Sequence, residues 1–258
     1  MRVAIFSDVH GNLTALEAVL ADIDEQAPDV VFFAGDLCVF GARPAECLEL
    51  VRELEIACIY GNTDEWIEGP PLLSDDIDEE ERRRRQHVHD ICDWTHVQLN
   101  EMQRAWLREL PFHRRISPTP NPRDDLLIVH ANPRDVDQVI YPPVSLQKKL
   151  FGEVKQQDDD LRPLLENLII DVLAFGHLHV PNVRRWDDIT LANISSVSLP
   201  GDGDDRAKYG LLTWANGAGW SVEHRYVEYD VGKELDALAA RQPPDWENLI
   251  KRLEAGRS

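Results

Sequence analysis

The chain has 258 residues, and its 47 Asp and Glu residues against 27 Lys and Arg residues give a formal net charge of -20. A field of this sign disfavours binding to a polyanionic duplex, which excludes a general nucleic-acid-binding protein. Because the chain lacks both a membrane span of roughly 20 successive apolar residues and a signal-peptide pattern, we expect a cytoplasmic protein that does not bind membranes.

The start of the chain alternates short apolar runs with segments of helical periodicity. Leu13, Leu16, Val19, Leu20 and Ile23 recur at the spacing of one helix face. This rhythm predicts strands at 2–6, 30–33 and 56–60, with helices at 13–23 and 45–54 between them. Alternating strands and helices favour a parallel sheet with right-handed crossovers, so the carboxyl ends of the three strands should meet at one edge.

The region from about 66 to 124 interrupts this alternation. We predict that it forms a helical cap inserted into a single domain that spans residues 1–258. It contains an acidic and basic segment at 74–85, a helix ending near Trp94 and a second helix at 101–110. The basic run at 82–85 suggests a phosphate-binding surface. Because acidic residues at 78–81 precede it, ion pairs along a solvated helix face are the simpler interpretation.

The rest of the chain contains two buried strands and then two hairpins. Apolar runs at 126–129 and 172–175 predict the buried strands, with a polar loop and short helices between them. Runs near 182–186, 189–194, 210–214 and 220–229 are separated by short turns, which is typical of β-hairpins. We therefore expect an antiparallel second sheet, followed by two packing helices near 234–240 and 246–253.

The four cysteines, Cys38, Cys47, Cys58 and Cys92, have no regular spacing. A thiolate metal site or a redox pair would need a motif such as C-x-x-C, which is absent. We therefore expect buried thiols that behave as small hydrophobic residues in a reducing compartment.

Five short segments with metal-binding side chains lie at the ends of these apolar runs. Just after a strand, residues two apart point to the same side, so Asp8 with His10, and His177 with His179, can bind one ion. In open α/β sheets, ligands bind beyond the carboxyl ends of the strands. A metal site is therefore predicted from seven side chains, namely Asp8, His10, Asp36, Asn62, His130, His177 and His179. The remaining histidines follow no such pattern and are expected to be structural or exposed.

In order and spacing, these segments resemble the signature of the calcineurin-like metallophosphoesterases, which runs D-x-H, G-D-x-x-D, G-N-H-[DE], H and G-H-x-H. The resemblance implies a four-layer α/β sandwich, with two mixed sheets flanked by helices and two metals at the strand ends. By position, it implies that one metal is held by Asp8, His10 and His179. It implies that the other is held by Asn62, His130 and His177, and that Asp36 bridges the two.

The ligand set suits two divalent or trivalent ions without selecting one of them. Nitrogen and oxygen ligands without sulfur are compatible with Mn, Fe, Zn or Ni, and we favour Mn. Two metals about 3.5–4 Å apart can share a hydroxide and stabilise the attacking and leaving oxygens of an in-line displacement at phosphorus. The resemblance therefore implies an enzyme that hydrolyses a small phosphorylated substrate.

One departure from the family pattern bears on the substrate. Thr63 stands where many members have the histidine of G-N-H-[DE], which protein phosphatases use as a general acid or phosphate ligand. A small prokaryotic phosphodiesterase-like subgroup also lacks it. Loss of a general acid matters least for good leaving groups, so we expect hydrolysis of phosphodiesters or of phosphoanhydrides such as dinucleoside polyphosphates. The alternatives are a phosphomonoesterase or Ser/Thr protein phosphatase, and a non-catalytic, metal-stabilised interaction module of the same fold.

Four further residues are weaker candidates. We expect Asn12 and Arg134 to contact the substrate, Arg134 through a bidentate hydrogen bond to phosphate. An ion pair of Arg134 with a nearby aspartate is an equally good interpretation. Thr63 and Asp64 are expected to support the metal ligands from behind. No side chain is assigned as catalytic, because a hydroxide shared by the metals would be the nucleophile.

Overall fold

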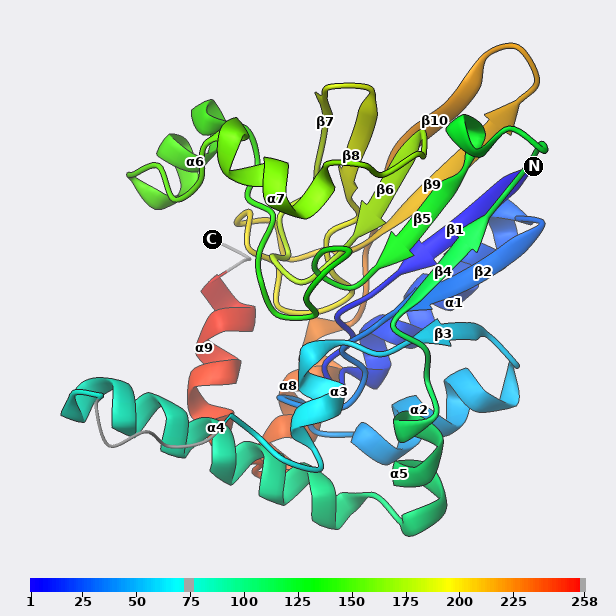
Figure 1. The fold of residues 1–258 in the computed structure, drawn as a ribbon. Helices are drawn as coiled ribbons and strands as arrows, with labels where there is room; N and C mark the ends of the chain where they lie inside the picture. The colour runs from blue at the N-terminus through cyan, green and yellow to red at the C-terminus, as the bar shows by residue number, and fades with distance from the viewer. Residues whose placement is uncertain (72–76, 256–258) are drawn as a thin grey trace.

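The computed structural model describes residues 1–71 and 77–255 and contains two five-stranded sheets (Figure 1). The first sheet has the order β10-β9-β1-β2-β3 and the second the order β4-β5-β6-β8-β7. The first sheet consists of β1 (Arg2–Phe6), β2 (Val30–Ala34), β3 (Ala57–Ile59), β9 (Ala207–Ala215) and β10 (Gly219–Val227). The second consists of β4 (His113–Ile116), β5 (Leu126–Val129), β6 (Val172–Phe175), β7 (Asn182–Trp186) and β8 (Ile189–Asn193).

The parallel arrangement predicted for the first three strands is confirmed. β1 pairs with β2, with Val3 opposite Val30, and β2 pairs with β3, with Phe32 opposite Ala57. The crossovers contain α1 (Leu13–Gln26) and α2 (Pro44–Glu53). Because the three strands run in one direction, the loops that follow them lie at the same edge of the sheet.

The two hairpins join different sheets, which corrects the prediction of a separate antiparallel second sheet. β9 pairs antiparallel with β1 and carries β10 on its outer side. β8 instead pairs parallel with β6 and carries β7. A hairpin pattern fixes how two strands pair with each other, whereas the sheet edge that they extend depends on long-range packing.

Hydrophobic clusters separate four layers of structure. Alternate residues of β1 face opposite sides, so that Val3 and Ile5 pack between the sheets while Ala4 and Phe6 pack toward α1 and α2. On the outer side of the second sheet, β5, β6 and β8 pack against α7 (Arg162–Leu165), which follows α6 (Val144–Phe151) and η2 (Asp158–Leu161). Burial on both faces explains why these strands are continuously apolar. The order helix, sheet, sheet, helix is the expected four-layer sandwich.

The region from 66 to 124 is only partly helical, so only a part of the predicted cap consists of helices. After the short α3 (Asn62–Trp66) it contains α4 (Glu79–Gln98) and α5 (Glu101–Arg108), which lie below the sheets in Figure 1. From His113 onward the chain forms β4, which pairs antiparallel with β5, and then η1 (Pro122–Asp124). β4 is an exposed edge strand with a basic sequence, so hydrophobic periodicity could not reveal it.

The basic run on α4 is paired with an acidic residue of the same helix. Glu81 accepts a hydrogen bond from Arg84 and another from Arg85, the latter over 2.8 Å between Nε and Oε1. The ion-pair interpretation is confirmed for these two arginines. Residues 74–76 of the predicted acidic segment lie outside the described residues.

Two C-terminal helices pack as a pair beside the loop that follows β8. They are α8 (Val231–Arg241) and α9 (Trp246–Ala255). Leu238 and Leu249 from this pair form a buried cluster with Leu199 of that loop. The buried carboxylate of Glu234 also forms an ion pair with Arg43, which precedes α2. These two helices are thereby attached to the loop after β8 and to the segment that precedes α2.

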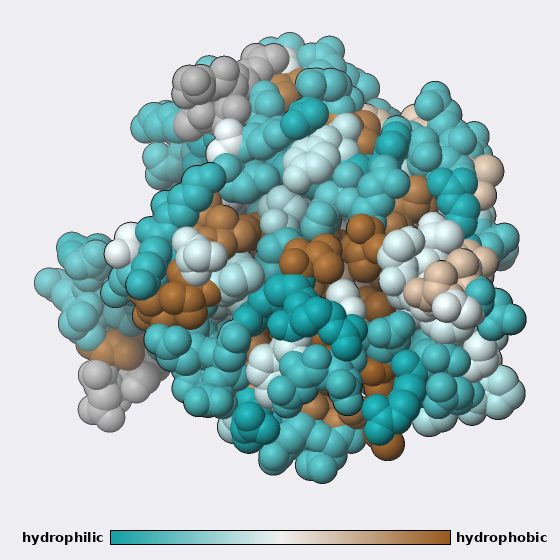
Figure 2. All heavy atoms as spheres, turned by 90° about the horizontal axis from the view of Figure 1, so that it is seen from above, coloured by the Kyte–Doolittle hydropathy of each residue, from teal (hydrophilic) through white to brown (hydrophobic). Residues whose placement is uncertain are grey.

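The state of the cysteines and the polarity of the surface are those expected from the sequence. All four cysteines are buried and unpaired, as predicted. Among the described residues, no helix has both the length and the hydrophobicity that a membrane span needs. Figure 2 shows a face on which hydrophilic residues predominate and hydrophobic residues lie in small groups.

Candidate metal centre

The loops after β1, β2 and β6 place candidate ligands on strained backbone. Asp8, His10, Asp36, His177 and His179 all have positive φ, between 48° and 64°. This left-handed conformation is uncommon for residues other than glycine, and such residues cluster at active sites and ligand clamps. Backbone hydrogen bonds hold the strained turns together, such as Asp8 N–H to the carbonyl of Gly35 at 2.9 Å.

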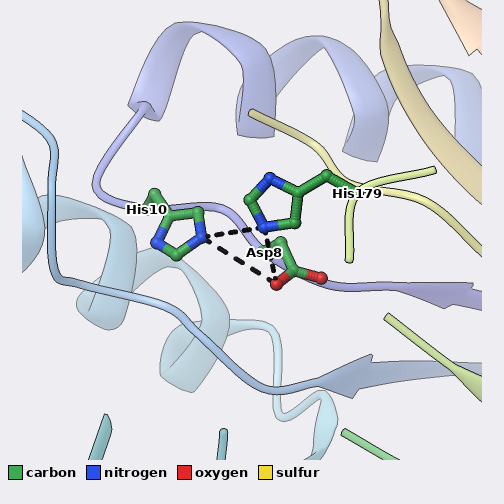
Figure 3. A group of neighbouring side chains, drawn as sticks. All are labelled: Asp8, His10 and His179. Atoms are coloured by element: carbon green, nitrogen blue, oxygen red, sulfur yellow. Dashed lines mark hydrogen bonds and ion pairs between the residues drawn. The ribbon is translucent and has the colours of Figure 1, made fainter. Parts of the chain in front are cut away.

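Asp8, His10 and His179 form the first cluster (Figure 3). His179 Nε2 lies 3.1 Å from Asp8 Oδ1 and 3.2 Å from His10 Nε2. His10 Nε2 lies 3.8 Å from Asp8 Oδ1. Figure 3 shows the three side chains pointing toward one another from the end of β1 and from the distant loop after β6. One ion could therefore contact all three.

The second cluster gathers around His130. Its Nε2 lies 3.0 Å from Asn62 Oδ1, 3.2 Å from His177 Nδ1 and 3.5 Å from Asp36 Oδ1. The other oxygen of Asp36, Oδ2, lies 3.8 Å from His10 Nε2 in the first cluster. The Asp36 carboxylate thus lies between the two clusters, and the structure brings all seven predicted ligands together.

Backbone carbonyls determine which nitrogen of each histidine faces the clusters. The four contacts are His10 Nδ1 to Val39 O at 2.9 Å, His130 Nδ1 to Ala34 O at 2.9 Å, His177 Nε2 to Asp137 O at 2.8 Å and His179 Nδ1 to Leu199 O at 2.7 Å. A carbonyl oxygen only accepts, so the contacting nitrogen carries the proton and the other nitrogen of a neutral ring presents a lone pair. Two lone pairs that face each other at 3.2 Å repel each other unless a proton or a metal ion lies between them. The donor set therefore fits two metal ions.

The charges of the buried side chains also indicate that the two clusters suit bound cations. Burial alone would raise the pKa of Asp36, but the nearby His130 lowers it strongly. Burial alone would lower the pKa of His130, but the carboxylate of Asp36 raises it to about 10. Burial lowers the pKa of His10 to about 4. A proton on His130 thus offsets buried negative charge when no cation is bound, and metal ions compete with protons for these ligands.

Asp64 joins two of the ligand loops. Its Oδ2 accepts hydrogen bonds from the backbone N–H groups of Asp36 at 2.8 Å and Gly61 at 2.9 Å. Its Oδ1 accepts from Leu37 N–H at 2.9 Å. Burial and the charge of Asp36 raise the pKa of Asp64 to about 7. Asp64 thus holds the backbone of both loops, and its support of the metal ligands stays a prediction.

The backbone at Gly61 and Thr63 approaches Asp36 closely. A Cβ atom on Gly61 would lie 2.1 Å from Asp36 Oδ1 and 2.6 Å from Asp36 N, so only glycine fits there. Thr63 N–H donates to Asp36 Oδ1 at 2.9 Å. The Thr63 hydroxyl is buried and has no hydrogen-bond partner among the described residues. Thr63 therefore supports Asp36 through its backbone.

Asn12, a predicted substrate contact, is buried at the start of α1. Its Oδ1 accepts from Ala15 N–H at 3.0 Å and caps the helix. Its Nδ2 donates to Ser198 Oγ at 3.1 Å and to Tyr229 Oη at 3.5 Å. These contacts give Asn12 a structural role, and binding of substrate by this residue stays a prediction.

Arg134, the other predicted substrate contact, is exposed in the loop after β5. Its backbone N–H donates to Asn132 Oδ1 at 2.8 Å, which holds the turn. Within the described part of the chain, no ion pair joins its guanidinium to Asp135 or Asp137. A contact of Arg134 with phosphate stays a prediction.

Several contacts of the site escaped sequence reasoning. Ser7 Oγ donates to Asp8 Oδ2, and the ring of Phe40 meets His10 edge-on with centroids 5.5 Å apart. The carbonyls that orient the histidines have no side-chain signal at all.

Comparison with known proteins finds relatives along almost the whole chain. The family model of the calcineurin-like phosphoesterase superfamily domain matches residues 1–217. A metallophosphoesterase from Sphaerobacter thermophilus, known from its crystal structure, is 27% identical, with 99% of each chain covered and a TM-score of 0.69. The uncharacterized protein MJ0912 of Methanocaldococcus jannaschii is 26% identical over 99% of this chain and 98% of its own length. The phosphodiesterase YfcE of Escherichia coli is 25% identical over 82% of this chain and 87% of its own length.

The region matched by the family model contains all seven candidate ligands and ends before α8. The family is metal-dependent, in agreement with the two ligand clusters. On the evidence of this match, the four-layer fold and the order of the site segments, the chain belongs to the calcineurin-like phosphoesterase superfamily.

Proposed function

We propose that the protein is a dinuclear metal-dependent phosphoesterase that hydrolyses small phosphodiesters. Hydrolysis adds one water at phosphorus and breaks one P–O bond, so a diester yields a phosphomonoester and an alcohol. Phosphoanhydrides such as dinucleoside polyphosphates are the second substrate class in this proposal.

The position of Asp36 between the two clusters is the observation that carries the proposal. Its Oδ1 lies 3.5 Å from His130 Nε2, and its Oδ2 lies 3.8 Å from His10 Nε2. Asp8, His10 and His179 would hold one ion, and Asn62, His130 and His177 the other. Two bound ions would supply Lewis acidity and a nucleophile derived from water. The carbonyl-bound imidazoles keep the ligand nitrogens oriented.

Thr63 supports diesters over phosphomonoesters with poor leaving groups. A threonine hydroxyl does not ionise near neutral pH, so it cannot act as the general acid that a departing alkoxide needs. The relative named as a phosphodiesterase, YfcE, also supports this choice. Substrates whose leaving group is an aryl oxide or a phosphate should therefore react fastest.

A metal-reconstitution assay tests the proposal. After removal of metals by a chelator, activity on bis(p-nitrophenyl) phosphate should vanish, and Mn²⁺ should restore it. We expect lower activity on p-nitrophenyl phosphate and none on a phosphoserine peptide. Asp36→Ala and His177→Ala should abolish activity, whereas His113→Ala, a change on the exposed edge strand β4, should retain it.

Two outcomes would contradict the proposal. Full activity in the metal-free protein would exclude the metal-dependent mechanism. If the Mn-loaded protein hydrolysed neither diesters, anhydrides nor monoesters, a non-catalytic interaction module would explain the fold better.

A further inference from the structure

A pocket of about 260 Å³ opens beside the second ligand cluster, between α3, α4 and the loop after β5. We call it the cap pocket and define it by Trp66, Glu81, Arg85, Val88, His89 and Asp137. None of these residues belongs to the ligand clusters. The pocket is smaller than a typical ligand site of about 300–1,000 Å³, so it suits one part of a substrate.

One helix spacing and one hydrogen bond place the cap pocket next to the candidate metal centre. Trp66 follows Asn62 by four residues in α3, so both side chains are on one face of this helix and about 6 Å apart along its axis. Asp137, another lining residue, accepts a hydrogen bond through its carbonyl from His177 Nε2 at 2.8 Å. A substrate whose phosphate lies at the metals could therefore extend a neighbouring group into this pocket.

The apolar walls of the pocket favour a flat ring. Trp66 and Val88 are half-buried side chains that pack against the core of the first sheet. His89 also lines the pocket, and its imidazole is held by a hydrogen bond from Nε2 to the carbonyl of Pro71 at 2.8 Å. Aromatic side chains bind nucleobases and other planar groups by stacking, which tolerates different bases.

The charges of the pocket disfavour a polyphosphate chain. The guanidinium of Arg85 is already paired with Glu81, with 2.8 Å between Nε and Oε1. Asp137, which also lines the pocket, adds a second carboxylate. Burial, together with the charges of Asp135 and Asp137, raises the pKa of the adjacent Glu65, which indicates a negative potential there. An uncharged group should enter this pocket more readily than additional phosphates.

From this geometry we infer that the cap pocket binds an uncharged planar aromatic group of the substrate, such as the base of a nucleoside phosphodiester. This inference rests on the proposed function, and it separates the two substrate classes named there. Nucleoside diesters with a single phosphate should bind better than dinucleoside polyphosphates. Trp66 would be a specificity-determining residue.

A pair of phosphorylated probes tests the inference by calorimetry on the Mn-loaded protein. Adenosine 5′-monophosphate carries a base, and ribose 5-phosphate lacks it. We expect the wild type to bind the nucleotide about 10-fold more tightly, as a single stacked base allows. Trp66→Leu should remove most of this difference without changing the affinity for ribose 5-phosphate, and Trp66→Phe should keep it.

Matched variants separate recognition from folding. Trp214→Leu changes a partly buried tryptophan far from the pocket, on β9 beside the N-terminus, and it should leave both affinities unchanged. If Trp66→Leu does not fold, Val88→Glu adds a carboxylate to the pocket from a half-buried helix position and should weaken only nucleotide binding. Equal affinities of the wild type for the two probes, or an equal loss of both in Trp66→Leu, would overturn the inference. Diester hydrolysis without base preference refutes the pocket alone, whereas absence of hydrolysis refutes the proposed function.

Discussion

The approach of Gly61 to Asp36 allows a sharp test of how the centre is built. A Cβ atom introduced by Gly61→Ala would lie 2.1 Å from Asp36 Oδ1 and 2.6 Å from Asp36 N. Neither atom can move alone. Asp36 N–H donates to Asp64 Oδ2 at 2.8 Å, and Asp36 Oδ1 accepts from Thr63 N–H at 2.9 Å. The substitution must therefore displace the carboxylate that lies between the two clusters.

The cost of Gly61→Ala follows from two contributions. Overpacking a tightly filled site destabilises a protein by about 1–3 kcal/mol. Loss of the charge-assisted hydrogen bond from Thr63 N–H adds about 1.5–3 kcal/mol. We expect the free energy of unfolding to fall by about 2.5–6 kcal/mol as the sum of these terms. Because displaced supporting contacts typically weaken metal sites about 10- to 100-fold, Mn²⁺ affinity should fall by that factor.

Urea denaturation of the metal-free protein and calorimetric titration with Mn²⁺ measure the two effects separately. Gly69→Ala is the matched control, because a Cβ atom there meets nothing within 4 Å. It should change stability by less than about 0.5 kcal/mol. If Gly61→Ala unfolded at the wild-type urea concentration and bound Mn²⁺ normally, the close approach would not constrain Asp36 and our reasoning would be refuted.

Three further predictions concern other parts of the fold. Burial alone would raise the pKa of Asp22, but hydrogen bonds from Arg225 and Tyr209 lower it. The ionised carboxylate therefore stabilises the folded protein above its ordinary pKa, and this contribution is lost as the pH falls. The unfolding free energy of Asp22→Asn should be about 1–2 kcal/mol below the wild type at pH 7, and urea denaturation should show the gap narrowing below about pH 4. Leu249→Ala, at a site only 3% exposed, should cost about 2–4 kcal/mol in the same measurement. Burial raises the pKa of Cys38 well above its ordinary value, so a chromogenic disulfide reagent should modify this thiol at pH 7 only after unfolding.

The position of the site could be predicted because its ligands follow strongly apolar strands. Val3 to Phe6 and Leu126 to Val129 are buried on both faces, and this produces continuous apolar runs with recognisable ends. The carboxyl ends of parallel strands share one edge of a sheet, so residues such as Asp8 and Asp36 had to lie near each other. The apolar runs, together with the rule that parallel strands end at one edge of the sheet, were therefore sufficient to predict where the site lies.

The remaining features depend on contacts that no local pattern encodes. The polar edge strand β4 has a neighbour on one side only, so its sequence need not be apolar. The carbonyls of Val39 and Leu199 orient His10 and His179, yet every residue has a carbonyl. Their role appears only once the long-range fold brings the loops together.

The C-terminal helices show how far the support of the centre extends beyond the family match, which ends at residue 217. The carbonyl oxygen of Leu199 accepts a hydrogen bond from His179 Nδ1, while the Leu199 side chain packs with Leu238 of α8 and Leu249 of α9. Glu234 of α8 pairs with Arg43, in the loop region that also carries the carbonyl partner of His10. A chain cut after residue 217 would keep all seven ligands but lose this packing. The helices after the matched region are therefore part of the structure that holds the first cluster in place.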